Sequence, residues 1–303
     1  MFSYDDIINK ARIATKNNDY ETAKNLYLEA FKIQINVGDL YDLGTIYYQL
    51  DNYKEALICY MNVIEATPDI ALAYYSVGYI YSMLQNYHDA INYYQEAIKL
   101  KPDFSDAYIN LAMAYEAMQD DDKAFASYLK VLEIDPNNYF VNHNIGAHYM
   151  QQGNLEKALE HLMKSYDVNS DTDNINYNLG LLYFKLNRFD EAIKYYEKEI
   201  ARDDANPLAY LNIAILYKDE LKKYDLSKYY YLKGIERYKD YADLWYNLGC
   251  LYAILNDYEN AYNCLMYSYI KDISLLEFSY QDIELDQFRQ SEEFIKLKNQ
   301  FAG

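Results

Sequence analysis

Five asparagines recur at almost constant spacing along this sequence of 303 residues. They stand 34 residues apart, with one interval of 35, and they are Asn110, Asn144, Asn178, Asn212 and Asn247. A primary amide donates and accepts hydrogen bonds at once, so it can act toward a peptide backbone as a neighbouring strand does. Such a row predicts a surface that holds an extended segment with little regard to its side chains. In the alternative interpretation, the amides are only solvated.

Residue types that support catalysis or bind metals lack the necessary spacing. His143 and His148 are five apart, which does not place them on one helix face, and His88 and His161 belong to separate predicted helices. The three cysteines form no CxxC pair, which indicates a reducing compartment without a disulfide framework. There is no Gly-rich phosphate loop and no GxSxG motif. We therefore expect no enzymatic activity, no metal and no cofactor.

Charge and hydropathy exclude other classes of function. The formal net charge is −19, which disfavours nonspecific binding to nucleic acid or to an anionic membrane surface. No run of about 18 apolar residues occurs, so we expect no membrane span. The first residues carry two acids and no apolar segment, so we expect no secretory signal. These features together predict a cytoplasmic protein.

The asparagines must be positioned by a repeated element, which is most complete in residues 71–104. Gly78 and Ala90, twelve residues apart, are the small residues at which two amphipathic helices approach each other. Asn86 is expected to supply the left-handed turn between the helices. Pro102 cannot continue the second helix because it lacks an amide hydrogen. A single hairpin would leave an apolar face in water, so its stability requires further copies.

The same pattern predicts eight tandem units in residues 1–274. They start near residues 4, 37, 71, 105, 139, 173, 207 and 242. Residues 275–303 depart from it and are interpreted as C-terminal capping helices, because the ends of a solenoid need a polar outer face. The seventh unit has one extra residue before Ser227, which predicts a longer turn. It also has Gly234 in its second helix, which predicts local looseness because glycine costs a helix about 1 kcal/mol relative to alanine.

The repeat resembles the tetratricopeptide repeat family, whose W-x2-L-G-x2-Y…A-x3-F…P motif has a period of 34 residues. The eighth unit carries this motif most fully, as Trp245, Leu248, Gly249, Tyr252 and Ala261. The resemblance implies an all-α fold, a right-handed superhelical solenoid of helix-turn-helix hairpins.

The resemblance also implies which residues line the concave groove. The first helix of each unit faces inward, and the five asparagines occupy the sixth position of their units, which resembles the asparagine ladder of some superhelical members. Aromatic residues at other inner positions are Tyr41, Tyr75, Tyr79, Tyr177, Phe184 and Tyr246. These rings are expected either to bury part of a partner or to pack on the neighbouring repeat. No Lys or Arg occupies an inner position in units two to five, which speaks against a carboxylate clamp.

We therefore expect a non-enzymatic protein–protein interaction scaffold. It would bind an extended peptide or protein segment of unknown identity in the concave groove, and it would neither bind nucleic acid nor span a membrane. The alternative is a self-associating assembly factor, a homo-oligomer formed through apolar residues of the caps, namely Phe2, Phe294 and Phe301.

Overall fold

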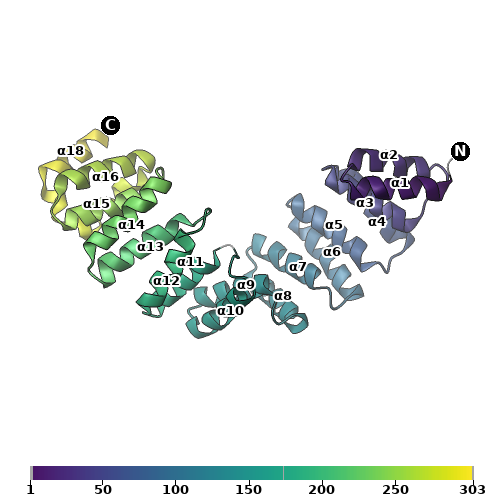
Figure 1. Cartoon of the computed structure of the whole chain (residues 1–303), viewed down its shortest axis with the longest axis horizontal. Coiled ribbons are helices and arrows are strands. Elements are labelled where there is room, and N and C mark those ends of the chain that lie inside the picture. The colour runs from purple at the N-terminus through teal and green to yellow at the C-terminus, as the bar shows by residue number, and fades with distance from the viewer. Residues whose placement is uncertain (1–2, 173, 302–303) are drawn as a thin grey trace. The chain divides into compact units, whose positions relative to one another are not determined.

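The computed structural model describes residues 3–172 and 174–301, and all regular secondary structure in these ranges is helical (Figure 1). The chain divides into two compact units, residues 1–141 and 142–303. The boundary falls inside helix α9, which spans Tyr139–Gln151. The predicted all-α fold of consecutive helical hairpins is confirmed.

The first unit contains four helical hairpins and the start of α9. Each odd-numbered helix packs antiparallel to the helix that follows it in this unit (Figure 1). The helices are α1 (Tyr4–Lys16), α2 (Tyr20–Ala30), α3 (Val37–Gln49), α4 (Tyr53–Ala66), α5 (Ala71–Met83), α6 (Tyr87–Leu100), α7 (Ser105–Ala117) and α8 (Asp121–Ile134).

The second unit continues the hairpins and ends in shorter elements. Its longer helices after α9 are α10 (Leu155–Val168), α11 (Ile175–Lys185), α12 (Phe189–Ile200), α13 (Pro207–Ile215), α14 (Tyr224–Arg237), α15 (Ala242–Ile254) and α16 (Tyr258–Lys271). The last elements are α17 (Ser274–Ser279), the 3-10 turns η2 (Ile283–Leu285) and η3 (Phe288–Gln290), and α18 (Glu292–Phe301). The division into eight repeats in residues 1–274 and a cap in residues 275–303 stays a prediction.

Small residues let the two helices of a hairpin approach closely. A Cβ atom added to Gly78 would lie 2.9 Å from the ring of Tyr94 and 3.2 Å from the carbonyl oxygen of Ala90. Ala90 is fully buried. A Cβ atom added to Gly180 would lie only 2.6 Å from the ring of Tyr196. Glycine is therefore required by the close approach of the neighbouring helix at these positions.

The turn between α5 and α6 is formed by a different residue from the one expected. Asn86 has a φ of −88° and caps α6, where its side chain accepts a hydrogen bond from the backbone N–H of Asp89. The left-handed residue is Gln85, with a φ of 59°. The prediction that Asn86 takes the left-handed conformation is wrong, because an N-cap residue needs a non-helical backbone that aims its side chain at the helix start.

The extra residue of the seventh unit is absorbed inside a helix. Residues Leu216–Glu220 form a π-helical turn, η1, directly after α13. The backbone N–H of Leu221 donates to the carbonyl oxygen of Leu216 at 3.2 Å, five residues earlier. Because the insertion widens a helical turn instead of extending the connection, the expected longer turn is not found.

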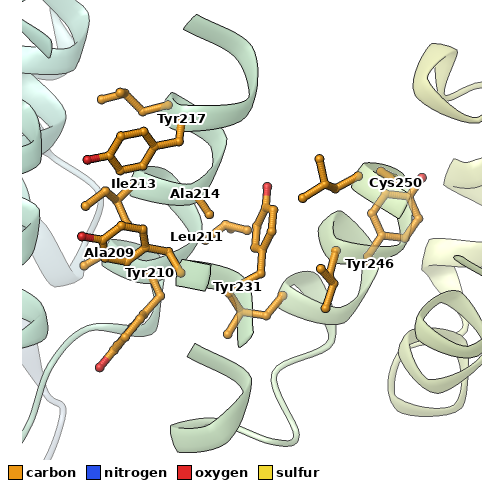
Figure 2. Close-up of a cluster of buried hydrophobic side chains, with 14 of the residues drawn as sticks. Ala209, Tyr210, Leu211, Ile213, Ala214, Tyr217, Tyr231, Tyr246 and Cys250 are labelled. Carbon is orange, nitrogen blue, oxygen red and sulfur yellow. The ribbon is translucent and has the colours of Figure 1, made fainter. Parts of the chain in front are cut away.

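The expected looseness around Gly234 is also wrong. A Cβ atom at this residue would lie 2.9 Å from Cβ of Tyr210 and 3.0 Å from Cδ1 of Leu244. Helices α13, α14 and α15 pack here around a dense buried cluster, in which Tyr231 of α14 lies between residues of α13 and those of α15 (Figure 2). Gly234 therefore permits a close three-helix contact.

Candidate functional site

Hydrogen bonds join the first helix of one repeat to the first helix of the next in the first unit. The hydroxyl groups of Tyr41 in α3 and Ser76 in α5 lie 2.8 Å apart. The side-chain amide of Asn110 in α7 donates to the hydroxyl of Tyr75 in α5 at 2.8 Å. Both bonds connect the fifth position of one repeat to the sixth position of the next, 35 residues later.

The second unit repeats this arrangement. The amide nitrogen of Asn178 in α11 lies 2.8 Å from Nε2 of His143 in α9. The amide of Asn212 in α13 donates to the hydroxyl of Tyr177 in α11 at 3.4 Å. The spacing in the sequence indicated these asparagines, but their pairing and the role of His143 as a partner were not predicted. The constant spacing of 35 residues between Tyr or His and Asn or Ser was the available signal.

Asn247 is placed differently from the other predicted ladder residues. Its amide donates to the carbonyl oxygen of Asp243, in its own helix α15, at 2.9 Å. The fifth position of the preceding repeat is Leu211, a hydrocarbon side chain that offers no acceptor. Asn247 therefore differs from Asn110, Asn178 and Asn212, because its side chain bonds within its own helix and theirs bond to the preceding repeat.

The ladder residues are also divided between the two compact units. Asn110 lies in the first unit, whereas Asn144, Asn178 and Asn212 lie in the second. All four side chains belong to half-buried residues.

The anchored amides retain hydrogen-bonding capacity. An asparagine amide has two N–H donors and a carbonyl oxygen with two lone pairs. The amide nitrogen of Asn178 donates one hydrogen bond to His143. Its second N–H and its carbonyl oxygen provide further hydrogen-bonding capacity. Asn212 also lies beside Tyr196, whose pKa is raised by burial and lowered to a smaller extent by this amide. The arrangement can therefore present amide groups in fixed orientations to a peptide backbone.

The aromatic residues named with the ladder contact their neighbours in the fold. The ring of Tyr41 lies 5.0 Å from that of Tyr60, and the ring of Tyr75 lies 4.9 Å from that of Phe104. Burial raises the pKa of Tyr75 to about 12. These contacts agree with the packing interpretation, and a role in partner binding stays a prediction.

Three further aromatic residues from inner positions also contact neighbouring rings in the fold. Tyr79 is half-buried, with its ring 5.7 Å from that of Tyr48. Phe184 is half-buried and lies 6.0 Å from Phe189. Tyr177 is half-buried beside Tyr196, at a ring distance of 6.3 Å.

The C-terminal segment contacts inner positions of the last two repeats. Tyr246 is only 4% exposed and donates its hydroxyl to Oδ2 of Asp282 at 2.7 Å. Lys218, in the π-helical turn, is 3% exposed and donates to both carboxylate oxygens of Glu284, at 2.6 Å to Oε2. Burial raises the pKa of the Cys250 thiol, which also lies against Asp282. These contacts, which were not predicted from the sequence, fix η2 against α15 and η1.

Family models described as tetratricopeptide repeat match residues 40–70, 71–104, 105–138, 139–205 and 230–262. The chain belongs to the tetratricopeptide repeat family. Members of this family are typically non-enzymatic scaffolds for protein–protein interactions. No curated protein matches the chain.

Several solved structures resemble this tetratricopeptide repeat protein. A tetratricopeptide repeat protein from Parabacteroides merdae has 17% identity and a TM-score of 0.56, over 77% of this chain and 92% of that one. The APC/C hetero-tetramer Cut9-Hcn1 has 17% identity and a TM-score of 0.53, over 88% of this chain and 52% of that one. MamA residues 41 to the end from Desulfovibrio magneticus has 20% identity and a TM-score of 0.50, over 55% of this chain and 95% of that one. At these identities, the likeness concerns the fold alone.

Two of the three apolar residues proposed for self-association lie in the described part of the chain, and both pack against other residues of the same chain. Phe294 is 5% exposed, and its ring lies 5.6 Å from that of Phe288. Phe301 is half-buried, 5.8 Å from the ring of Tyr269. Phe2 lies outside the described residues. Self-association through the caps stays a prediction, and these contacts give it no support.

Two features are absent from the residues that the structure describes. No group of three or more His, Cys, Asp or Glu residues in residues 3–172 and 174–301 is arranged to hold a metal ion. Among the helices in the same ranges, none is both long and apolar enough to cross a membrane.

Proposed function

We propose that this repeat protein is a non-enzymatic scaffold whose second unit binds an extended segment of a partner protein along α9, α11 and α13. Asn144, Asn178 and Asn212 pair with the backbone of that segment. The observation that supports this proposal is the anchoring of Asn178 and Asn212 by the preceding repeat, at 2.8 and 3.4 Å. In the first unit, Asn110 is anchored to Tyr75 and is proposed to act in the same way.

Anchoring matters because binding is opposed by the loss of side-chain freedom. Immobilising a flexible side chain on binding costs about 0.5–1.5 kcal/mol. An amide that is already held by Tyr177 or His143 has lost most of that freedom on folding. Each hydrogen bond to a partner then contributes about 0.5–1.5 kcal/mol net. The two anchored amides of α11 and α13, with two bonds each, supply roughly 2–6 kcal/mol.

The first experiment compares two sets of asparagine variants. Peptides are selected from a displayed library of random dodecapeptides on the full chain, and their Kd values are measured by fluorescence polarisation. Asn178→Ala combined with Asn212→Ala should weaken the peptides that bind the second unit at least about tenfold, because roughly 2 kcal/mol or more is lost. Asn247→Ala is the matched control, because that amide is bound to Asp243 within its own helix, and it should change Kd less than about twofold.

The second experiment tests recognition of the backbone. Peptides that bind the second unit are resynthesised with N-methyl groups at alternate residues, or with individual side chains replaced by alanine. N-methylation removes the amide donor and should abolish binding in one of the two alternating registers. Unchanged affinity after N-methylation in both registers, or after the double asparagine substitution, would refute the proposed backbone pairing.

A further inference from the structure

Exposed apolar side chains form a line on α5 in the first unit. Leu72 is 46% exposed, Met83 is 50% exposed, and Tyr79 between them is half-buried. Their intervals of seven and four residues place them on one face of the helix. Met113 in α7 is 46% exposed. Single exposed apolar residues are common, but several that adjoin on two helices indicate an interaction surface.

The register between α5 and α7 shows that these side chains adjoin. The two helices pack against each other, and the bond from Asn110 to Tyr75 fixes their alignment at 2.8 Å. Tyr79 lies one helical turn after Tyr75, and Met113 lies three residues after Asn110. Tyr79 and Met113 therefore occupy the same position in successive repeats, next to each other across the helix pair.

The charges beside this line have one sign. Helices α3, α5 and α7 contain no Lys or Arg, and their acids are Asp39, Asp42, Asp106 and Glu116. Asp39 and Asp42 are paired with Arg12, at 2.8 and 3.9 Å. The two acids on α7 are exposed, seven residues before and three residues after Met113, and Glu116 is held by the hydroxyl of Tyr128 at 3.1 Å. An apolar line flanked by carboxylates complements an apolar residue flanked by cations.

We propose that this surface binds a segment of another protein in which an exposed Leu, Ile, Met or Phe is flanked by Lys or Arg. We name it the Met113 surface and define it as Leu72, Tyr79, Met83, Asp106, Met113 and Glu116. This proposal rests on the proposed function in one respect, namely that the inner positions of the first helices bind partners. A second copy of this chain is disfavoured as the occupant, because two chains of net charge −19 repel each other.

The chemistry of the Met113 surface supports this choice. Methionine side chains adapt to different apolar shapes, so two of them can accept any of several anchor residues. Tyr79 supplies a rigid aromatic wall, because its ring packs near those of Tyr48 and Tyr75, at centroid distances of 5.7 and 6.2 Å. Interface energy concentrates on such buried apolar contacts, while the flanking charges select the partner and raise its association rate.

The test is a selection with a matched control. A displayed library of random dodecapeptides is selected on the full chain, and enriched peptides are assayed by fluorescence polarisation. A group of peptides should carry an apolar residue within two positions of Lys or Arg, and Met113→Ser should weaken these peptides at least about tenfold. Met61→Ser is the control, since Met61 is 40% exposed on the second helix α4, and it should change Kd less than twofold.

Further variants separate this site from the asparagine site. Asp106→Lys should weaken the basic peptides at least about fivefold, whereas Asn178→Ala with Asn212→Ala should leave their Kd unchanged. Failure of the asparagine proposal would thus not affect this result. The inference is overturned if no enriched peptide carries an apolar residue beside Lys or Arg, if none is enriched, or if Met113→Ser has no larger effect on these peptides than Met61→Ser. Self-association of the chain in sedimentation, lost in Met113→Ser, would also overturn it.

Discussion

Substituting Glu284 by Gln should lower the free energy of unfolding of the second unit by about 2–4 kcal/mol. Glu284 is the partner of Lys218, whose side chain is 3% exposed and lies in the π-helical turn after α13. The substitution keeps the size of the side chain and removes its charge. The ammonium group of Lys218 then remains buried with incomplete compensation.

The magnitude follows from distance and burial. Two unit charges about 3 Å apart attract each other by about 5 kcal/mol at an effective dielectric constant of about 20. Removing one partner of a fully buried pair costs about 3–5 kcal/mol, because the remaining charge is left without compensation. Two features reduce this cost here. Glu284 is 30% exposed, so water reaches it, and Asp219 lies 3.6 Å from the ammonium group of Lys218.

The assay is urea denaturation followed by the fluorescence of Trp245, the only tryptophan in the sequence, which lies in α15 of the second unit. Glu160→Gln is a control within the same unit, because Glu160 is 59% exposed, its partner Lys164 is 46% exposed, and such a surface pair contributes less than about 1 kcal/mol. Lys218→Met added to Glu284→Gln should recover most of the loss, because it removes the uncompensated charge. Equal losses in Glu284→Gln and Glu160→Gln, or a double variant no more stable than Glu284→Gln alone, would refute the role of the buried charge.

Two further outcomes are expected, one for packing and one for pH. Gly234→Ala should destabilise the protein by about 1–3 kcal/mol in urea denaturation, because the added Cβ would lie 2.9 Å from the Cβ of Tyr210. A gain in stability of about 1 kcal/mol, as expected at an unconstrained helical glycine, would contradict this prediction. Burial, with a smaller effect from Lys164, lowers the pKa of His161 below its usual 6.5, so its NMR titration midpoint should fall below 6.5. As the pH falls, the unfolded chain binds a proton at His161 before the folded chain does. His161 therefore contributes stability above pH 6.5 that is lost as the pH falls through its folded pKa, and His161→Gln should reduce this pH dependence of stability. A titration midpoint at or above 6.5 would refute the prediction.

The repeat period was enough to predict the helices and their pairing. The spacing of Gly78 and Ala90 predicted where α5 and α6 approach, and the structure places the carbonyl oxygen of Ala90 3.2 Å from a Cβ atom added to Gly78. This prediction succeeds because it depends on local periodicity and on the size of two side chains. Both are properties of the sequence within one hairpin.

The errors arise where several solutions satisfy the same sequence. An extra residue can lengthen a connection or widen a helix, and only the packing of α13 against its neighbours selects the π-helical turn at Leu216–Glu220. Gly234 could mark a loose helix or a close contact, and the choice depends on Tyr210 and Leu244 in other helices. The pair of Lys218 and Glu284, 66 residues apart, has no periodic signal, because it joins a repeat to the segment after the repeats.

The pairing of fifth and sixth positions changes how the asparagine row should be interpreted. The bond from Asn212 to Tyr177 gives this amide a structural role, so an asparagine at the sixth position does not by itself indicate a ligand. The same bond fixes the side chain and uses only part of its hydrogen-bonding capacity. Structural and binding roles therefore act together, and the comparison with Asn247 separates them, because that amide is bound within its own helix and not to a preceding repeat. A ligand that follows the row should depend on Asn178 and Asn212 but not on Asn247, although all three residues share the same position in the repeat.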